Sequence, residues 1–155
     1  MLKQLKRVSI DAGGRFATEA ELQFLKDYLA SVAHRISAYE KIRDQEEKIM
    51  DQVEEKACAQ NPRVFYKGTQ DRSDICRRDR KYLLKSMAAA MLISDLDRLR
   101  DGMLLWQRTL VKAFQNDQAS QVTYQVMPKV MEQQLTPAEM KQIMPALQLS
   151  QALLS

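Results

Sequence analysis

Residues 18–36 read TEAELQFLKDYLASVAHRI and carry the signals of an amphipathic helix. Thr18 and Glu21 match a capping box, in which each side chain bonds an exposed backbone N–H group at the start of a helix. Behind this start, apolar side chains recur every three or four residues, as one face of a helix requires. These positions are Leu22, Leu25, Leu29, Val32 and Ile36. The stretch therefore predicts a helix that begins after Thr18 and buries one face.

The rest of the chain predicts further helices separated by short breaks. Asn61-Pro62 closes one helix, because the residue before a proline disfavours α geometry, and Ser94-Asp95 closes another. Pro137 suits the first turn of the last helix, where its missing N–H group costs nothing, whereas Pro128 is expected to interrupt the helix before it. The expected helices cover residues 2–12, 18–36, 37–60, 73–93, 95–115, 122–135 and the residues from 136 onward.

Two polar segments lie between these helices. Residues 66–73 predict a loop, and Ser73 or Asp74 is expected to cap the helix that follows it. Residues 116–120 predict a turn.

The composition indicates one all-α domain. The 155 residues suit a single core, and 45% hydrophobic and 28% charged residues are ordinary for a globular protein. With 4 Gly and 4 Pro and no alternating runs of β-branched residues, the chain favours helix throughout. No segment approaches the roughly 20 apolar residues of a membrane span, and residues 1–10 lack the apolar core of a secretory signal. The net charge of +4 is spread over mixed sequence and weakly favours an acidic partner.

The two cysteines, Cys58 and Cys76, match neither a disulfide framework nor a zinc-ligand cluster. Both are expected as thiols in a reducing compartment. Cys58 is expected to be a small core residue, and His34, the single histidine, a structural side chain rather than a haem ligand.

The segment Ile75–Tyr82 holds the residues with distinctive chemistry. Helical spacing puts Cys76 and Asp79 on one face, with Arg78 on its flank. A thiol nucleophile, a carboxylate acceptor and a guanidinium donor suit a ligand with an electrophilic vinylic end, N–H groups and carboxylate arms. The alternative to a ligand site is an inert thiol beside a surface ion pair, on a helix that also carries Arg77, Arg80 and Lys81.

Cys76-x-Arg78-Asp79 followed by Tyr82 resembles the chromophore helix of phycobiliproteins, the allophycocyanin and phycocyanin subunits. Residues 14–23 are similar to the start of the first globin helix of that family. Asn61-Pro62 and Ser94-Asp95 are similar to the family's breaks around the chromophore helix, so the resemblance spans about residues 10–110. It implies an all-α, globin-like helical bundle with a short N-terminal helical extension. It further implies one domain over residues 1–155, with an assembly segment at 1–18 and a globin-like core at 19–155.

The resemblance also implies the binding roles of four residues. Cys76 would form a thioether with phycocyanobilin or a related linear tetrapyrrole (bilin), and Asp79 would accept hydrogen bonds from its pyrrole N–H groups. Arg78 would pair with a propionate, and Tyr82 would pack beside the chromophore. No catalytic residue and no metal ligand is expected.

The implied function is light harvesting by a bilin-bearing subunit, not an enzyme, in or around the phycobilisome. Expected partners are other phycobiliprotein subunits, in a homo- or hetero-oligomer, and possible linker proteins, with no nucleic acid and no membrane insertion. The expected location is cytoplasmic and peripheral to the thylakoid, in a cyanobacterium or a plastid stroma, within photosynthetic electron transport. Departures from the family pattern at residues 67–72 and at Leu83 leave a pigment-free assembly, docking or regulatory protein as the alternative. A weaker third interpretation is transient bilin carriage.

Overall fold

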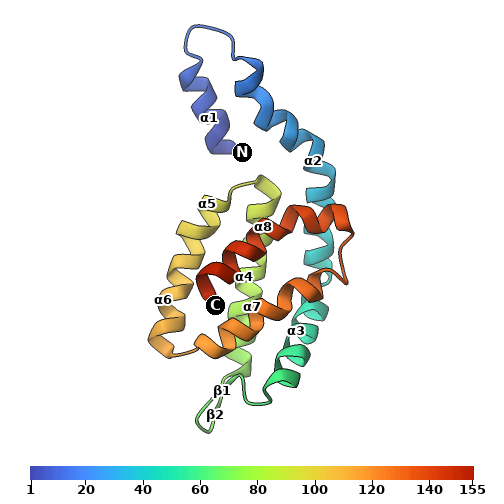
Figure 1. Cartoon of the computed structure of the whole chain (residues 1–155), viewed down its shortest axis with the longest axis vertical. Helices are drawn as coiled ribbons and strands as arrows, with labels where there is room; N and C mark the ends of the chain where they lie inside the picture. Colours follow the sequence, from blue (N-terminus) through green and yellow to red (C-terminus); the bar gives the residue numbers. More distant parts are fainter.

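Helices make up nearly all of the chain (Figure 1). The computed structural model describes residues 1–155, apart from the side chain of Leu2. The helices are α1 (Leu2–Asp11), α2 (Glu19–Asp44), α3 (Glu46–Gln60), α4 (Ser73–Ile93), α5 (Leu96–Leu99), the π-helical turn η1 (Arg100–Leu104), α6 (Leu105–Phe114), α7 (Asp117–Met131) and α8 (Pro137–Leu154). The strands β1 (Tyr66–Lys67) and β2 (Gln70–Asp71) form one small antiparallel hairpin. The predicted all-α fold class is confirmed.

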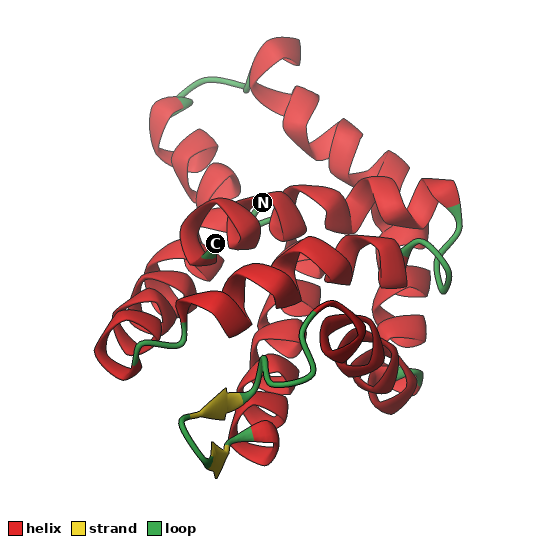
Figure 2. Cartoon of the chain, turned by 60° about the horizontal axis from the view of Figure 1, so that its bottom comes forward, coloured by secondary structure: helices red, strands yellow, loops and turns green.

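The core lies between α4, α7, α8, α3 and the second half of α2. Its largest fully buried side chains include Ile49, Leu83, Met87, Met127 and Ile143. In α2 the first buried residue is Ala38, so the first half of this helix contributes little to the core. That half and α1 project from the bundle as an N-terminal arm (Figure 1). The hairpin lies at the other end of the bundle, beside the start of α4 (Figure 2).

The predicted capping box at the start of α2 is present. Glu21 N–H donates to Thr18 Oγ1 at 3.3 Å, and Thr18 N–H donates to Glu21 Oε2 at 2.8 Å. Arg15 also donates to both carboxylate oxygens of Glu21, at 2.9 and 2.7 Å. Local hydrogen bonds therefore fix the start of α2, and the capping box among them is predicted by the sequence.

The predicted helix boundary at Ser37 is wrong, because α2 continues without a break to Asp44. Ser37 does not cap a helix, since its hydroxyl donates to Glu139 Oε1 of α8 at 2.6 Å. Ala38 and Ile42, which follow at helical spacing, are buried and keep the chain helical across this point.

The prediction for α7 is also wrong at two points. The helix begins at Asp117, within the segment expected to be a turn, and it runs through Pro128 to Met131. Pro128 removes one helical hydrogen bond near the end of the helix, while Met127 and Val130 beside it are fully buried. Burial of this face outweighs the lost bond.

The loop expected at residues 66–73 holds the hairpin, with Gly68 at a φ of +61° in its turn. Neither Ser73 nor Asp74 caps α4, because its N-cap position is Arg72, without a capping side-chain hydrogen bond. Asp71 instead bonds the first residue of the helix. Its Oδ1 accepts from Ser73 N–H at 2.8 Å and from Ser73 Oγ at 2.6 Å.

The end of α4 matches the prediction. Ser94 adopts the left-handed conformation with a φ of 51°, and Asp95 accepts a hydrogen bond from Arg98 N–H at 3.0 Å. The π-helical turn η1 follows, in which Leu105 N–H bonds the carbonyl of Arg100, five residues earlier. This turn therefore holds one residue more than an α-helical turn.

Glu139 connects α8 to α2, and its ionisation makes this contact sensitive to acid. Burial alone would raise its pKa, but hydrogen bonds from Lys41 (2.8 Å), Ser37 and the Thr136 backbone hold the pKa at about 2. Because the unfolded chain binds this proton at a pH near 4.5, the stabilisation is complete above that pH and is lost as pH falls toward 2. We expect Glu139→Gln to lower the free energy of unfolding by about 1–3 kcal/mol at neutral pH.

The measurement is urea unfolding of both proteins at a series of pH values. The difference between wild type and Glu139→Gln should shrink as the pH is lowered. A difference that stays constant with pH would contradict the assigned ionisation of Glu139.

Candidate functional site

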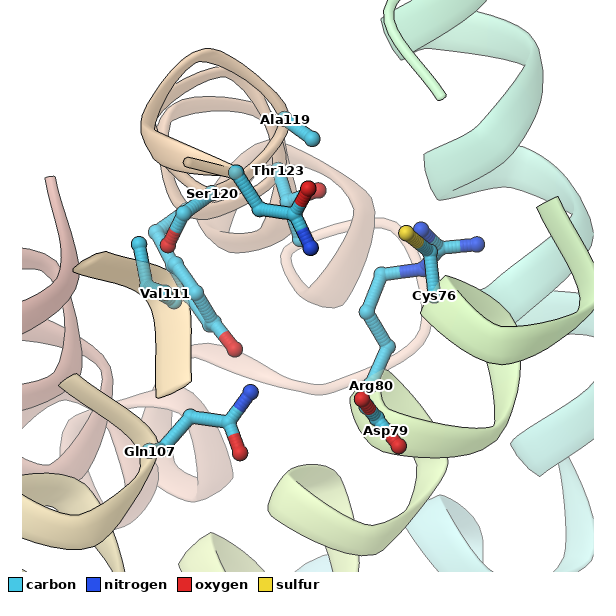
Figure 3. A pocket seen from close by; sticks show the side chains of 10 residues that line it. Cys76, Asp79, Arg80, Gln107, Val111, Ala119, Ser120 and Thr123 are labelled. Atoms are coloured by element: carbon cyan, nitrogen blue, oxygen red, sulfur yellow. The ribbon is translucent and has the colours of Figure 1, made fainter. Parts of the chain in front are cut away.

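The candidate site is built on one face of α4. Cys76 and Asp79 lie one helical turn apart, as the sequence predicts, and both line a small cavity between α4, α6 and α7. Opposite them lie Gln107 of α6 and Thr123 of α7 (Figure 3), and Tyr124 of α7 also lines the cavity. The structure therefore brings together the thiol and the carboxylate that the sequence singled out.

The cavity beside Cys76 is small, with a volume of about 50 Å³. Pockets that hold drug-sized organic ligands span roughly 300–1,000 Å³. In this conformation the cavity is therefore several-fold smaller than a site for an organic ligand of this size.

Arg80 lies next to Cys76 in the wall of the cavity. Its side chain is 5% exposed and runs from the level of Asp79 to the level of the Cys76 sulfur (Figure 3). One terminal nitrogen donates to Glu54 of α3, and the guanidinium carbon lies 4.3 Å from the centroid of the Phe65 ring. A charged group over an aromatic face gains electrostatic stabilisation. Within the described part of the chain, Arg80 Nε is buried without a hydrogen-bond partner.

Glu54 is shared between two arginines of α4. Its Oε1 accepts from Arg80, and its Oε2 accepts from Arg77 Nη1 at 2.7 Å. Arg77 also reaches Glu47 at 2.8 Å and Asp51 at 2.7 Å. This ionic network joins α3 to α4 directly behind the cavity.

The other two predicted site residues lie outside the small cavity. Arg78 is on the surface with its side chain 76% exposed, and its Nη2 donates to Asp79 Oδ1 at 3.2 Å. Tyr82 is 63% exposed and lines a different hollow.

This second hollow has a volume of about 480 Å³ and lies further along the same face of α4. Ser86 and Ala89 continue the wall that Tyr82 begins, and Gly102 and Met103 of η1 form the opposite wall. Because α4 runs antiparallel to the segment α5–η1–α6 (Figure 1), Gln107 in the small cavity follows Met103 along that opposite wall. We call the two hollows together the α4 trough, with its Cys76 end at the small cavity and its Tyr82 end at the larger one.

Burial sets the protonation of the groups at the Cys76 end. It raises the pKa of the Cys76 thiol, and the nearby positive charge of Arg80 opposes this shift without cancelling it. Burial likewise raises the pKa of the Tyr124 hydroxyl. Both groups are neutral at physiological pH. Only a small fraction of Cys76 is therefore in the thiolate form, and the residue is a weak nucleophile in this conformation.

The remaining residues discussed in the sequence lie away from this trough or beside it. Cys58 of α3 packs against the small cluster of Ala57, Val64 and Phe65. Cys76 of α4 packs against the same cluster. His34 is exposed on α2. Among the described side chains, no group of three His, Cys, Asp or Glu residues is placed to hold a metal ion. None of the described helices is long and apolar enough to cross a bilayer.

Arg80 is the residue of this site that the sequence did not identify. The sequence places it in a basic run with Arg77, Arg78 and Lys81, where it reads as one more surface charge. Its separation of four residues from Cys76 is the one signal that could have located it, because this spacing puts both on one helix face.

Comparison with known proteins assigns this arrangement to a family. The sequence profile described as phycobilisome protein matches residues 8–153, which is nearly the whole chain. No curated protein sequence matches the chain at a significant level.

The raised pKa of Cys76 predicts slow reaction with thiol reagents. In a Cys58→Ala protein at neutral pH, iodoacetamide should alkylate Cys76 more slowly than it alkylates the same protein unfolded in urea. The rate should rise with pH through a midpoint above 9.0, the ordinary value for a cysteine, because the thiolate is the reactive form. A rate at neutral pH that equals the rate in urea would contradict the assigned burial.

Proposed function

Because the chain belongs to the phycobilisome protein family, we propose that it is a light-harvesting subunit that carries a bilin on Cys76. The observation that supports this most is the convergence of Cys76 and Asp79 on one cavity. A bilin attached at Cys76 needs a thiol at its vinylic end and an acceptor for its pyrrole N–H groups one helical turn further on. Cys76 and Asp79 have these chemistries at this spacing.

The trough fits this ligand in its chemistry and in most of its length. The Tyr82 end has a volume within the range of organic-ligand pockets, and Tyr82 offers an aromatic face there. From Cys76 to Ser86 the helix rises about 15 Å, along which a chain of rings can lie. The Cys76 end is the part that is too small, and the buried side chain of Arg80 forms part of its wall.

In this proposal the bound bilin would supply absorption of visible light. Cys76 would hold it covalently, Asp79 would accept from its N–H groups, and Tyr82 would restrict rotation of its rings by packing. Arg78, exposed at the rim beside Asp79, would pair with a carboxylate arm through its planar fork. None of these roles involves turnover, so the proposed protein is not an enzyme.

The N-terminal arm supports a proposal about partners. Phe16 at its tip is 98% exposed, and Ile10 and Leu29 on the arm are also largely exposed. Large apolar side chains left in water mark interaction surfaces. We propose that residues 1–18, with the start of α2, pair with another phycobiliprotein subunit, and that the globin-like domain over residues 19–155 extends into this arm through the first half of α2. Linker proteins are further candidate partners, and the proposed location is the cytoplasmic or stromal side of the thylakoid.

A second candidate function is favoured by the buried Arg80. A buried charged side chain in the wall of so small a Cys76 end suits a pigment-free subunit that uses the fold for assembly, docking or regulation. The two candidates differ in one measurable property, which is covalent pigment.

We expect the protein, produced together with bilin-making enzymes and a bilin lyase, to fluoresce in the presence of zinc on a denaturing gel. Cys76→Ala should abolish this signal, because the thioether can no longer form. Cys58→Ala is the matched control and should retain it. Loss through Cys58→Ala alone would assign attachment to the other thiol, and no signal in the wild type would favour the pigment-free function.

Asp79→Asn tests the second half of the site. This change keeps the size of the side chain but removes its charge and replaces one acceptor oxygen with a donor. We expect the variant to attach bilin at Cys76 yet to lose red absorbance and most of its fluorescence, because the pyrrole N–H groups lose their anionic partner. Arg78→Ala should instead lower the yield of attachment more than it changes the spectrum. An unchanged spectrum in Asp79→Asn would contradict the proposed contact.

A further inference from the structure

The two ends of the α4 trough differ about tenfold in volume, at about 50 and 480 Å³. The buried side chain of Arg80 lines the smaller end. This side chain covers the wall between Asp79 and Cys76 (Figure 3), which is the surface against which a ligand joined to Cys76 and bonded to Asp79 would lie.

The contacts that hold Arg80 come from outside the trough. Glu54 of α3 accepts its hydrogen bond, and the ring of Phe65, in the segment before the hairpin, lies against its guanidinium group. Among the described residues, Nε of Arg80 is buried without a hydrogen-bond partner, so the trough offers no acceptor to this nitrogen. A buried polar group without a partner is destabilising.

We propose that Arg80 is a movable plug, which closes the Cys76 end of the trough and must swing toward solvent before a tetrapyrrole can reach Cys76. The identity of the ligand rests on the proposed function, whereas the movement of Arg80 does not. Arg80 thus regulates access to the thiol through its contacts with Glu54 and Phe65.

The ionic network allows this movement at low cost. When Arg80 leaves, Glu54 keeps Arg77, whose Nη1 lies 2.7 Å from Oε2, so no carboxylate is left buried and unpaired. The departing guanidinium regains water for the Nε group that has no partner in the closed form. The route to solvent is short, because Cys76 and Asp79 on either side of it are both partly exposed.

The test compares two thiol reagents on a Cys58→Ala protein without bilin, one small (iodoacetamide) and one bulky (fluorescein maleimide). The small reagent reports the ionisation of Cys76, which the charge of Arg80 also affects. The ratio of the bulky to the small rate therefore isolates steric access. Arg80→Ala removes the plug, and Glu54→Gln and Phe65→Leu each remove one of its contacts while Arg80 stays.

We expect the ratio of rates to rise roughly tenfold or more in Arg80→Ala, and to rise in Glu54→Gln because a hydrogen bond between charged groups is among the stronger contacts of a side chain. Lys85→Ala is the matched control, since Lys85 belongs to α4 and pairs with Glu46 at 3.2 Å but does not line the cavity. Its ratio should equal that of the wild type. Far-ultraviolet circular dichroism identifies the variants that are folded, and the conclusion is drawn from those.

A ratio that stays at the wild-type value in the folded variants of Arg80, Glu54 and Phe65 would overturn the proposal. The same variants are then produced with bilin-making enzymes and lyase, which separates the plug from the proposed function. A raised ratio without pigment in any variant supports the plug and rejects the bilin-carrying function. Equal pigment in all variants with a flat ratio rejects the plug and leaves that function standing.

Discussion

The burial of one guanidinium group, that of Arg80, constrains the arrangement of three segments. A charge out of water requires compensation from a counter-charge, hydrogen bonds or a polarisable surface. Here Glu54 supplies the counter-charge from α3, and Phe65 supplies the aromatic face from the segment before the hairpin. In the closed form Arg80 therefore joins α3 and the segment before the hairpin to α4, beside the ion pairs that Arg77 makes with α3.

The same segments also meet at Cys76. The thiol contacts the cluster of Ala57, Val64 and Phe65, so the ring that holds Arg80 also belongs to the surroundings of the thiol. The protonation of Cys76, the volume next to it and the packing of α3 against α4 are therefore properties of one cluster.

Local signals in the sequence located most helix ends, and tertiary contacts account for the errors. The capping box at Thr18 and the breaks at Asn61 and Ser94 depend on neighbouring residues alone, and each lies where it was predicted. Ser37 and Pro128 carry equally plausible local signals, but a partner on α8 and a buried face of α7 override them. Such partners are distant in the sequence, so no local pattern around the affected residue indicates them.

The residues of the candidate site also differ in how far the sequence predicts their positions. The spacing of Cys76 and Asp79 predicts that they share a helix face, and both line the small cavity. For Arg80 the one signal in the sequence is its spacing of four residues from Cys76, which puts both on one helix face. Arg77, Arg78 and Arg80 are chemically identical, and this spacing does not say which of them is buried. That choice is made by Glu54 and Phe65, which are 26 and 15 residues away in the sequence.

The π-helical turn at Arg100–Leu104 has a consequence for comparing this chain with its relatives. Because the turn absorbs one extra residue, α5 before it and α6 after it can each keep the register of an uninterrupted helix. A relative with an ordinary α-helical turn here would be one residue shorter, yet present the same faces to the core. An alignment without a gap at this turn would then match Gln107 with the neighbour of its true counterpart, and every later position on the wall of the trough would be misassigned by one.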